Sequence, residues 1–451
     1  MTLSVAVIGA GPSGFYTVEA LLKLGLDCQI DILESLPTPY GLIRFGVAPD
    51  HQSTKRVTRA YERTARDEHV GYFGNVEIGR DVSLDELRGL YDAVVLAIGA
   101  PLDRGLDVPG GDKPGVHGAA AFVGWYNGHP DFRDLAPDLN CEAIAIIGNG
   151  NVALDVARVL VKTPGEMAKT DMPEYAAAAI HGAPIRDVHL LGRRGPVEAK
   201  WTNVELREMG QLEDCQVIID PEQLPERVEG DWSARDRRLR EKNLETLRSF
   251  VGQPPDGKRK RLHFQFYAKP VEVLGEERVT GLRLERTRVE DGRVVETGET
   301  FDLDCGLVVA AIGYRALPIE GVPFDERRGI VSNKEGRVAP GLYVVGWAKR
   351  GPTGVIGSNK PDADLIASHI AADLAPEGKG GGKPPGDKEG RAGLQVLLAE
   401  RRVAWVSFAD WLAIEAAEIA AAPSGAPRQK LFRIKDMLAV LGKSAGQRRT
   451  G

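Results

Sequence analysis

Cysteine is scarce in this sequence. Only four occur among 451 residues, at Cys28, Cys141, Cys215 and Cys305, and no two of them have the C-x-x-C spacing. That spacing is typical of iron–sulfur centres, structural zinc sites and redox-active dithiols. Its absence argues against all three on this chain. Cys28 and Cys305 stand at the start of apolar runs, and we expect them to be buried thiols in a reducing compartment.

The sequence also lacks apolar runs of membrane-spanning length and a large excess of positive or negative charge. The sequence has 58 Lys and Arg against 64 Asp and Glu, a net charge of -6, which gives no general attraction to nucleic acid or anionic membranes. LSVAVIGAGPSG already starts at residue 3, so no charged leader is expected before it. We therefore expect a cytoplasmic protein without a nucleic-acid or membrane partner. The length and the 43% hydrophobic content suit two or three α/β domains.

Glycine is placed in a pattern near the N-terminus. An apolar run at residues 5–8 precedes Gly9, Gly11 and Gly14, which have the G-x-G-x-x-G spacing, and a helical pattern follows to Leu24. In such a strand–turn–helix unit the first glycine allows the tight turn, the second lets the backbone approach a pyrophosphate, and the third lets helix and strand pack closely.

The next apolar run, residues 28–34, ends in an acid. Glu34 follows Gly14 at the interval typical of the residue that accepts both ribose hydroxyls, which selects an adenosine without a 2'-phosphate. The alternative is that Glu34 is only a solvated strand end. This unit is predicted to bind FAD.

A second unit of the same kind follows at residues 143–161. Gly148, Gly150 and Ala153 repeat the spacing, with alanine tolerated at the third position because the contact there is helix against strand. The next apolar run, residues 187–191, is followed by Gly192, Arg193 and Arg194 instead of an acid. Guanidinium groups bind a 2'-phosphate, which an acid would repel. The second site is therefore predicted to bind NADP, the alternative being two solvated arginines.

These patterns predict an α/β protein with two Rossmann-like, doubly wound domains, the NADP domain inserted into the FAD domain. Two similar buried strands, at residues 91–100 and 305–316, flank the second unit. The expected limits are an FAD-binding domain at 1–107 and 321–374, an NADP-binding domain at 108–320, a flexible linker at 375–390 and a C-terminal helical region at 391–451 that packs on the FAD domain.

Basic residues gather in the NADP half. Arg235, Arg237, Arg238, Arg240 and Lys242 share a helical run, and residues 258–261 form a Lys-Arg-Lys-Arg cluster expected in a loop. Such runs are usually solvated faces, but in an acidic protein they can also dock an acidic partner.

Seven stretches together resemble the adrenodoxin-reductase type of ferredoxin–NADP reductase, most closely its bacterial members, over about residues 1–370. They are VIGAGPSGFYT, PTPYGLIRFGVAPDH, YFGNVEIGRDV, FVGWYNGHPDF, IGNGNVALDVARVL, LLGRRGP and VVGWAKRGPTGVIGSNKPDA. GVAPDH and GWAKRGPTGVIG are specific to this type, whereas the glycine motifs occur in many flavoproteins.

The resemblance implies roles for individual residues. At the FAD site these are Ser13 at the phosphates, Glu34 at the ribose, Leu42 as lining, Ile78 (or Val82) beside the adenine, and Trp347, Gly354, Val355 and Ile356 at the isoalloxazine. At the NADP site they are Asn149, Gly150, Asn151, Val152, Arg193, Arg194 and Glu205, with Arg104 as a weaker match. His51 and Glu208 match a pair near the nicotinamide and the flavin, where positioning is the more plausible role.

The predicted function follows from the two cofactors. NADPH gives a hydride to the flavin, which passes electrons singly to a ferredoxin-type iron–sulfur protein, and the resemblance implies a monomer. An FAD- and NADPH-dependent monooxygenase and a diaphorase-type quinone reductase remain alternatives, as does an NADPH-binding redox sensor. A thioredoxin-reductase-like enzyme would need a dithiol, and the small subunit of glutamate synthase would need an N-terminal cysteine-rich domain.

Overall fold

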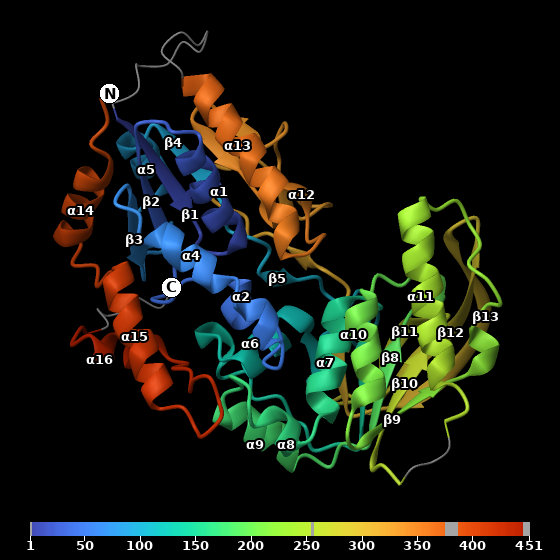
Figure 1. The fold of residues 1–451 in the computed structure, drawn as a ribbon. Helices are drawn as coiled ribbons and strands as arrows, with labels where there is room; N and C mark the ends of the chain where they lie inside the picture. Colours follow the sequence, from blue (N-terminus) through green and yellow to red (C-terminus); the bar gives the residue numbers. More distant parts are fainter. Residues whose placement is uncertain (1, 254–256, 375–386, 445–451) are drawn as a thin grey trace. The chain divides into compact units, whose positions relative to one another are not determined.

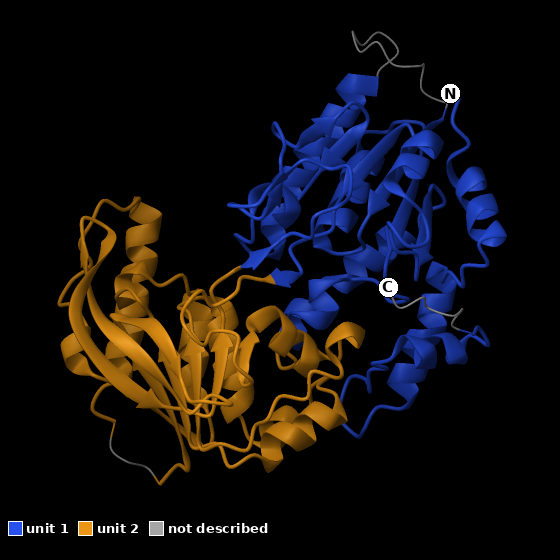
Figure 2. Ribbon diagram, turned by 180° about the vertical axis from the view of Figure 1, so that it is seen from behind, with its two compact units in different colours: residues 1–47, 51–102, 314–451 blue, residues 48–50, 103–313 orange. Residues whose placement is uncertain are grey.

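The computed structural model describes residues 2–253, 257–374 and 387–444 (Figure 1). The chain forms two compact units (Figure 2). Unit 1 comprises residues 1–47, 51–102 and 314–451, and unit 2 comprises residues 48–50 and 103–313. The predicted domain limits at 107 and 320 lie a few residues beyond the points at which the chain enters unit 2 and leaves it.

Unit 1 is built on a six-stranded sheet with the order β18-β19-β4-β1-β2-β3. Its strands are β1 (Leu3–Ile8), β2 (Cys28–Glu34), β3 (Val70–Gly74), β4 (Ala93–Leu96), β18 (Arg337–Ala339) and β19 (Leu342–Val344). All neighbours are parallel except β18 and β19. Every residue of β1 is buried, as expected of a parallel strand covered on both faces.

Helices cover both faces of this sheet. They include α1 (Pro12–Lys23), α4 (Thr58–Ala65), α5 (Leu84–Leu90) and α13 (Asn359–Leu374), with short helices α2 (Leu42–Phe45), α3 (Gln52–Lys55) and α12 (Trp347–Arg350). Val5, Val7 and Ile32 belong to the core under α1 and α13, whereas Ala6 and Leu96 belong to the core under α5. The alternation of side chains along the strands thus fills two cores.

Unit 2 repeats the plan with an all-parallel sheet, in the order β6-β14-β7-β8-β10-β9. The strands are β6 (Val116–Gly118), β7 (Ala143–Ile147), β8 (Asp187–Leu191), β9 (Cys215–Ile219), β10 (Lys260–Gln265) and β14 (Leu307–Ala310). Its helices are α6 (Ala119–Asn127), α7 (Asn151–Val161), α8 (Pro164–Met167), α9 (Glu174–Gly182), α10 (Asn203–Glu208) and α11 (Ala234–Phe250).

One face of the unit 2 sheet packs on an antiparallel sheet. Its three strands are β11 (Ala268–Leu274), β12 (Gly281–Glu290) and β13 (Arg293–Asp304). Leu282 and Leu284 of β12 share a core with Leu191 of β8 and Val308 of β14. Short strands complete the described chain: β5 (Leu102–Asp103), β15 (Tyr314–Arg315), β16 (Phe324–Asp325) and β17 (Ile330–Val331). The predicted α/β class with two Rossmann-type sheets is confirmed.

Within unit 1, the C-terminal region packs on the six-stranded sheet and its helices through α14 (Gly390–Glu400), α15 (Phe408–Ala420) and α16 (Ile434–Val440). Trp411 is fully buried, with its ring edge-on to Tyr40 at 5.8 Å between centroids.

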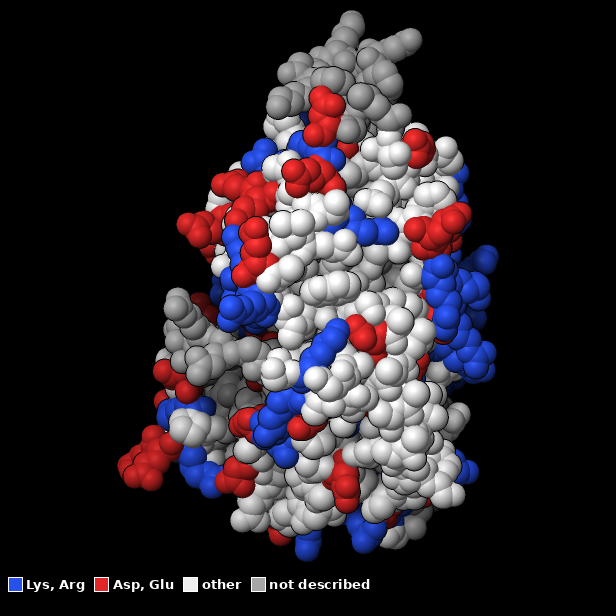
Figure 3. All heavy atoms as spheres, turned by 90° about the vertical axis from the view of Figure 1, so that its left-hand side faces the viewer, with Lys and Arg blue, Asp and Glu red and all other residues white. Residues whose placement is uncertain are grey.

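Lys and Arg are mixed with Asp and Glu on the side of the molecule that carries these helices (Figure 3).

The predicted linker at 375–390 is only partly described. Residues 375–386 lie outside the described residues, whereas Gly390 already begins α14. The Lys388 ammonium donates hydrogen bonds to the carbonyls of Arg88 and Tyr91, which fixes this end to unit 1. The low-complexity composition hid these contacts because they depend on a distant segment. In the described part of the chain, no helix combines the length and the apolarity that crossing a bilayer requires.

Candidate functional site

The first glycine turn has the geometry that a pyrophosphate site requires. Gly9 has a φ of +109°, and a Cβ there would lie 2.5 Å from the Ala97 carbonyl oxygen. A Cβ on Gly14 would lie 2.0 Å from the Gly9 carbonyl oxygen, so glycine is needed for α1 to approach β1. A Cβ on Gly11 would meet nothing within 4 Å. The backbone is therefore bare where a phosphate would approach the start of α1.

Glu34 lies beside this turn. Its Oε2 accepts the Ala10 N–H at 2.9 Å, and its Oε1 accepts the Leu36 N–H at 3.2 Å and the Ser35 hydroxyl at 3.1 Å. Burial raises the pKa of this carboxyl, and the hydrogen bonds oppose that rise. A carboxylate offers about four acceptor positions, so Oε2 keeps capacity for a ribose hydroxyl.

The other residues predicted for the FAD site differ in their surroundings. Leu42 begins α2 with 40% of its surface exposed, and a Cβ on the preceding Gly41 would lie 3.1 Å from Gly11 Cα, so α2 starts against the glycine turn. Ile78 is partly buried, whereas the alternative Val82 is only 1% exposed. A ligand can therefore contact Ile78 more readily.

Ser13 lies in the first turn of α1, and Trp347 begins α12. The Ser13 hydroxyl donates to Asn359 Oδ1 at 3.1 Å, so its predicted phosphate contact would use the oxygen as an acceptor or a rotated hydroxyl. A Cβ on Gly346 would lie 1.9 Å from Ser13 Oγ, which explains glycine before Trp347. Trp347 is only partly buried and does not belong to the described cores, which disfavours a purely structural role as a core aromatic.

The loop at Gly354, Val355 and Ile356 is predicted to lie at the isoalloxazine, and one of its three N–H groups is used within the loop. The N–H of Val355 donates to Ser358 Oγ at 3.0 Å, which commits it within the turn. Of the three N–H groups in this stretch, those of Gly354 and Ile356 therefore remain for a ligand at the isoalloxazine end. The sequence did not show this because a serine three residues ahead competes for the N–H only once the turn forms.

The second glycine turn repeats the first. Gly148 has a φ of +145°, and a Cβ there would lie 2.4 Å from the Ala311 carbonyl oxygen, whereas a Cβ on Gly150 would meet nothing within 4 Å. Ala153 is fully buried, in agreement with a methyl group at the helix–strand contact. Asn151 begins α7, and its Oδ1 accepts the Thr202 N–H at 3.0 Å.

Two equivalent hydrogen bonds align the two sites. The Gly9 N–H donates to the Leu33 carbonyl at 2.7 Å, and the Gly148 N–H donates to the Leu191 carbonyl at 2.8 Å. Glu34 in the first site therefore corresponds to Gly192 in the second. A Cβ on Gly192 would lie 1.7 Å from Asn149 Nδ2. The Asn149 amide occupies the place where an acidic side chain would begin, and its two polar atoms are buried without a partner among the described residues.

Arg193 and Arg194 follow this glycine with their backbone held. The Arg193 carbonyl accepts the Thr287 hydroxyl at 2.9 Å, and the Arg194 carbonyl accepts the Tyr267 N–H at 3.3 Å. Neither guanidinium forms an ion pair with any residue that the structure describes, and Arg194 Nε is buried without a partner. The antiparallel sheet thus fixes the turn and leaves both side chains available for an anion.

The remaining NADP residues are scattered over unit 2. Glu205 lies in α10 with Oε2 buried and unpartnered, and within the described ranges it forms no ion pair with Arg193 or Arg194. The Arg104 N–H donates to the Gly313 carbonyl at 3.1 Å. Val152 stands in the first turn of α7. Their contacts with NADP stay predictions.

Asp50 and Glu208 are connected through an arginine that the sequence analysis missed. The Arg158 side chain is fully buried in α7, with Nε 2.7 Å from Asp50 Oδ2 and Nη1 2.8 Å from Asp155 and 3.5 Å from Glu208. Arg158 and Lys162 hold the pKa of the Asp50 carboxyl well below its ordinary value against the effect of burial. The available signal was one arginine inside an otherwise apolar helical run, three residues after an acid.

His51 directly follows Asp50 and precedes α3. His51 belongs to unit 1 and Glu208 to unit 2, so their pairing near the nicotinamide stays a prediction. The structure adds that Arg158 forms ion pairs with both Asp50, which precedes His51, and Glu208.

The basic cluster at residues 258–261 was expected to form a loop, but half of it belongs to a strand. Lys260 and Arg261 begin β10, because their alternate neighbours Leu262 and Phe264 are core residues. Arg259 pairs with Asp214 at 2.6 Å, and the Lys260 ammonium donates to the Leu160 carbonyl at 2.8 Å. Much of this charge is therefore used within unit 2.

On α11, in contrast, some basic side chains face solvent. Arg237 donates to the carbonyls of Val228 and Gly230, and Arg240 lies 3.7 Å from the centre of the Trp232 ring. Exposed side chains that form no ion pair with described residues are those of Arg235, Arg238 and Lys242.

Two Rossmann-type turns, one beside an acid and one followed by two available arginines, are typical of a dinucleotide-dependent oxidoreductase. The family model "Pyridine nucleotide-disulphide oxidoreductase" matches residues 3–231. The chain is 44% identical over 98% of its length to NADPH:adrenodoxin oxidoreductase of Bos taurus, of which 92% is covered. It is 41% identical over 97% of its length to NADPH-ferredoxin reductase FprA of Mycobacterium tuberculosis, of which 98% is covered.

A solved structure agrees with these relatives. "Mycobacterium tuberculosis FprA in complex with NADPH" superposes with a TM-score of 0.92 at 41% identity, covering 98% of this chain and 99% of that one. The chain belongs to the family of adrenodoxin reductases and NADPH–ferredoxin reductases. The predicted family, fold class and oxidoreductase activity are confirmed, and FAD and NADP are the cofactors of this family.

Proposed function

We propose that this protein takes electrons from NADPH and delivers them to a small ferredoxin-type iron–sulfur protein. The observation that carries the proposal is the difference between two equivalent strand ends, Glu34 in one and Gly192-Arg193-Arg194 in the other. The first suits the ribose of FAD and the second the 2'-phosphate of NADPH. The relatives named NADPH–ferredoxin reductase support the acceptor.

The chemistry comes from the flavin, which when bound exchanges a hydride with a nicotinamide and single electrons with an iron–sulfur centre. The residues of the chain bind and orient. The bare backbone at Gly11 and Gly150, with the starts of α1 and α7, would hold the pyrophosphates of the two cofactors. The N–H groups of Gly354 and Ile356 are proposed to stabilise negative charge on the flavin.

His51 and Glu208 are proposed to position these groups and not to transfer protons. Hydride transfer needs no acid or base, and Arg158 already holds Glu208 in an ion pair at 3.5 Å. A cytoplasmic location and a monomeric state stay predictions.

The test is rapid mixing of the purified flavoprotein with NADPH or NADH, followed by reoxidation with a panel of ferredoxins. We expect the flavin absorbance to bleach much faster with NADPH, and reoxidation by at least one ferredoxin to exceed that by oxygen. Equal bleaching by both nucleotides would contradict the assignment of the second site. Reoxidation by oxygen with an organic substrate, and by no ferredoxin, would instead identify a monooxygenase.

A further inference from the structure

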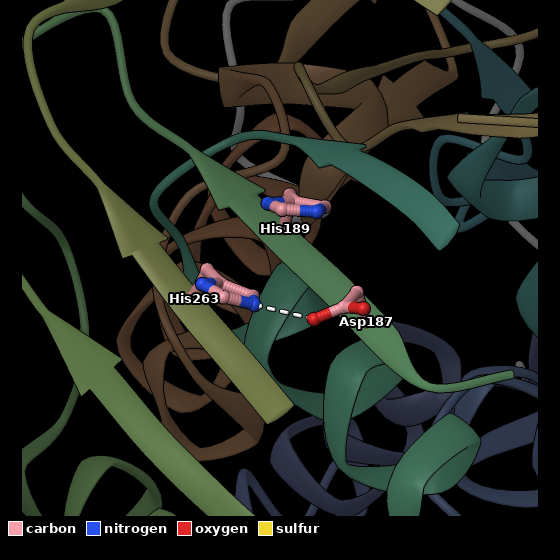
Figure 4. Close-up of side chains that lie close together, drawn as sticks. All are labelled: Asp187, His189 and His263. Carbon is pink, nitrogen blue, oxygen red and sulfur yellow. Dashed lines mark hydrogen bonds and ion pairs between the residues drawn. The ribbon is translucent and has the colours of Figure 1, made fainter. Parts of the chain in front are cut away.

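Three side chains of types that bind metals meet on the parallel sheet of unit 2 (Figure 4). His189 of β8 is in register with His263 of β10, and Asp187 lies two residues before His189 on β8. Residues at i and i+2 of a strand share a face, as do residues in register on neighbouring parallel strands. The fold therefore places all three side chains together.

Their ligand atoms lie near one another, although the two rings are stacked. The two imidazole rings are nearly parallel, with 4.5 Å between centroids. His263 Nε2 lies 2.7 Å from Asp187 Oδ1, and one ligand atom from each of the three residues lies within 4.8 Å of the others. Because imidazole lone pairs lie in the ring planes, the stacked rings have to turn about their side-chain bonds before both nitrogens point at one ion, at ligand distances of about 2.0–2.2 Å.

His189 provides an independent indication that a ligand belongs here. Only 9% of the residue is exposed, and its Nδ1 is buried with no hydrogen-bond partner among the residues that the structure describes. Buried polar atoms nearly always have a partner. The neighbouring His263 and Asp187 side chains are 21% and 18% exposed, which leaves access for an ion from solvent.

We propose that Asp187, His189 and His263 form a binding site for a divalent transition-metal ion of the zinc type, with water as the fourth ligand. Imidazole and carboxylate are ligands that zinc takes in proteins, and three protein ligands with one open position are a common arrangement. The ion takes the place of the hydrogen bond between His263 Nε2 and Asp187 Oδ1. The proton of that hydrogen bond moves to Nδ1 of His263 or to solvent. Bound there, the ion ties β8 to β10.

One neighbouring charge opposes the ion. The Arg261 guanidinium donates to both carboxylate oxygens of Asp187, at 2.6 and 2.5 Å. It neutralises part of the negative charge that a cation would use, so the affinity should be moderate, and removal of this guanidinium should tighten binding. This expectation separates the proposed site from nonspecific binding to surface histidines.

The test uses the full-length flavoprotein, treated with a chelator, and Zn²⁺ alone as the probe in isothermal titration calorimetry. We expect one zinc per chain, at least tenfold weaker binding for His189→Gln and His263→Gln, and tighter binding for Arg261→Gln. His69→Gln is the matched control, because His69 also pairs with an aspartate, at 2.9 Å, but is about half exposed on unit 1. It should bind zinc as the parent does.

Absence of a stoichiometric site in the parent overturns the proposal, as does equal binding by His263→Gln and His69→Gln, or an affinity of Arg261→Gln that is unchanged or weaker. A measurement on the parent protein guards against misfolded variants. Cu²⁺ added in place of zinc should give an electron paramagnetic resonance spectrum with coupling to two imidazole nitrogens. Coupling to one or none contradicts the site.

Discussion

At the scale of the residue, Arg193 and Arg194 should determine the choice between NADPH and NADH. Neither guanidinium is committed to a described partner, and a hydrogen bond to a charged group contributes about 1.5–3 kcal/mol. Replacing both by alanine should raise the KM for NADPH by roughly 10- to 100-fold and leave the KM for NADH nearly unchanged. Steady-state ferricyanide reduction with each nucleotide measures this. Arg186→Ala, a 64% exposed arginine just before β8, is the control.

Gly192 makes a second prediction at this scale. Because a Cβ there would lie 1.7 Å from Asn149 Nδ2, Gly192→Ala must displace the Asn149 amide from the nucleotide turn. We expect weaker binding of NADPH and NADH alike, by about tenfold or more, since the displaced turn serves the part that both share. Nucleotide titrations followed by flavin absorbance test this. Gly182→Ala, where a Cβ meets nothing within 4 Å, should bind as the parent does.

At the scale of the element, α15 is fixed to unit 1 by a buried ion pair between Arg44 and Glu418, whose side chains are 4% and 0% exposed. Glu418→Ala leaves a buried guanidinium without its carboxylate, which costs about 3–5 kcal/mol. The urea midpoint followed by tryptophan fluorescence should fall markedly. Glu415→Ala removes a partly exposed pair with Arg428 at 2.7 Å and should cost about 1 kcal/mol or less. Equal losses would show that burial of the pair is unimportant.

Glu86 in the first turn of α5 leads to a prediction of how stability changes at acidic pH. The Arg401 guanidinium and the Ser83 N–H lower the pKa of Glu86 to about 2. The unfolded value is higher, so this carboxylate stabilises the fold above about pH 4.5 and loses that effect as the pH falls towards 2. Glu86→Gln keeps the cap without the charge.

The difference in unfolding free energy between parent and Glu86→Gln should therefore be constant near neutral pH, below about 1 kcal/mol because Glu86 is 36% exposed, and vanish towards pH 2. Urea titrations at several pH values measure it. Asp85→Asn, at a 94% exposed side chain of the same turn, should have a smaller effect. A difference that grows on acidification contradicts the assigned cause.

At the scale of the whole molecule, the exposed basic residues of α11 are the best candidates for docking an acidic partner. The notable residues are Arg235, Arg238 and Lys242, since those at 259–261 make contacts within unit 2. Changing the three to glutamine should slow ferredoxin reduction several-fold at low salt and reduce its salt dependence. Ferricyanide reduction, which needs no docking, should not change. An unchanged salt dependence would place the docking surface elsewhere.

The sequence could predict much of the fold because its signals are local. The two glycine turns, the acid at Glu34 and the arginines at 193 and 194 each lie within one strand–turn–helix unit, where spacing fixes geometry. The same locality explains why both sheets and the pair of cofactors could be predicted before any contact was known. The motifs in the sequence also showed the resemblance to the family, and the similar relatives confirm it.

Other features depend on partners distant in the chain and only the tertiary structure decided them. Asn149 fills the space above Gly192, Ser358 takes the N–H of Val355, and Arg158 joins Asp50 to Glu208. The cluster of Asp187, His189 and His263 likewise exists only because β8 and β10 pair in one register. The sequence by itself determined the two strand–turn–helix units, because strand and turn geometry is local. Packing decided which polar groups remain available, because that depends on neighbours brought together by folding.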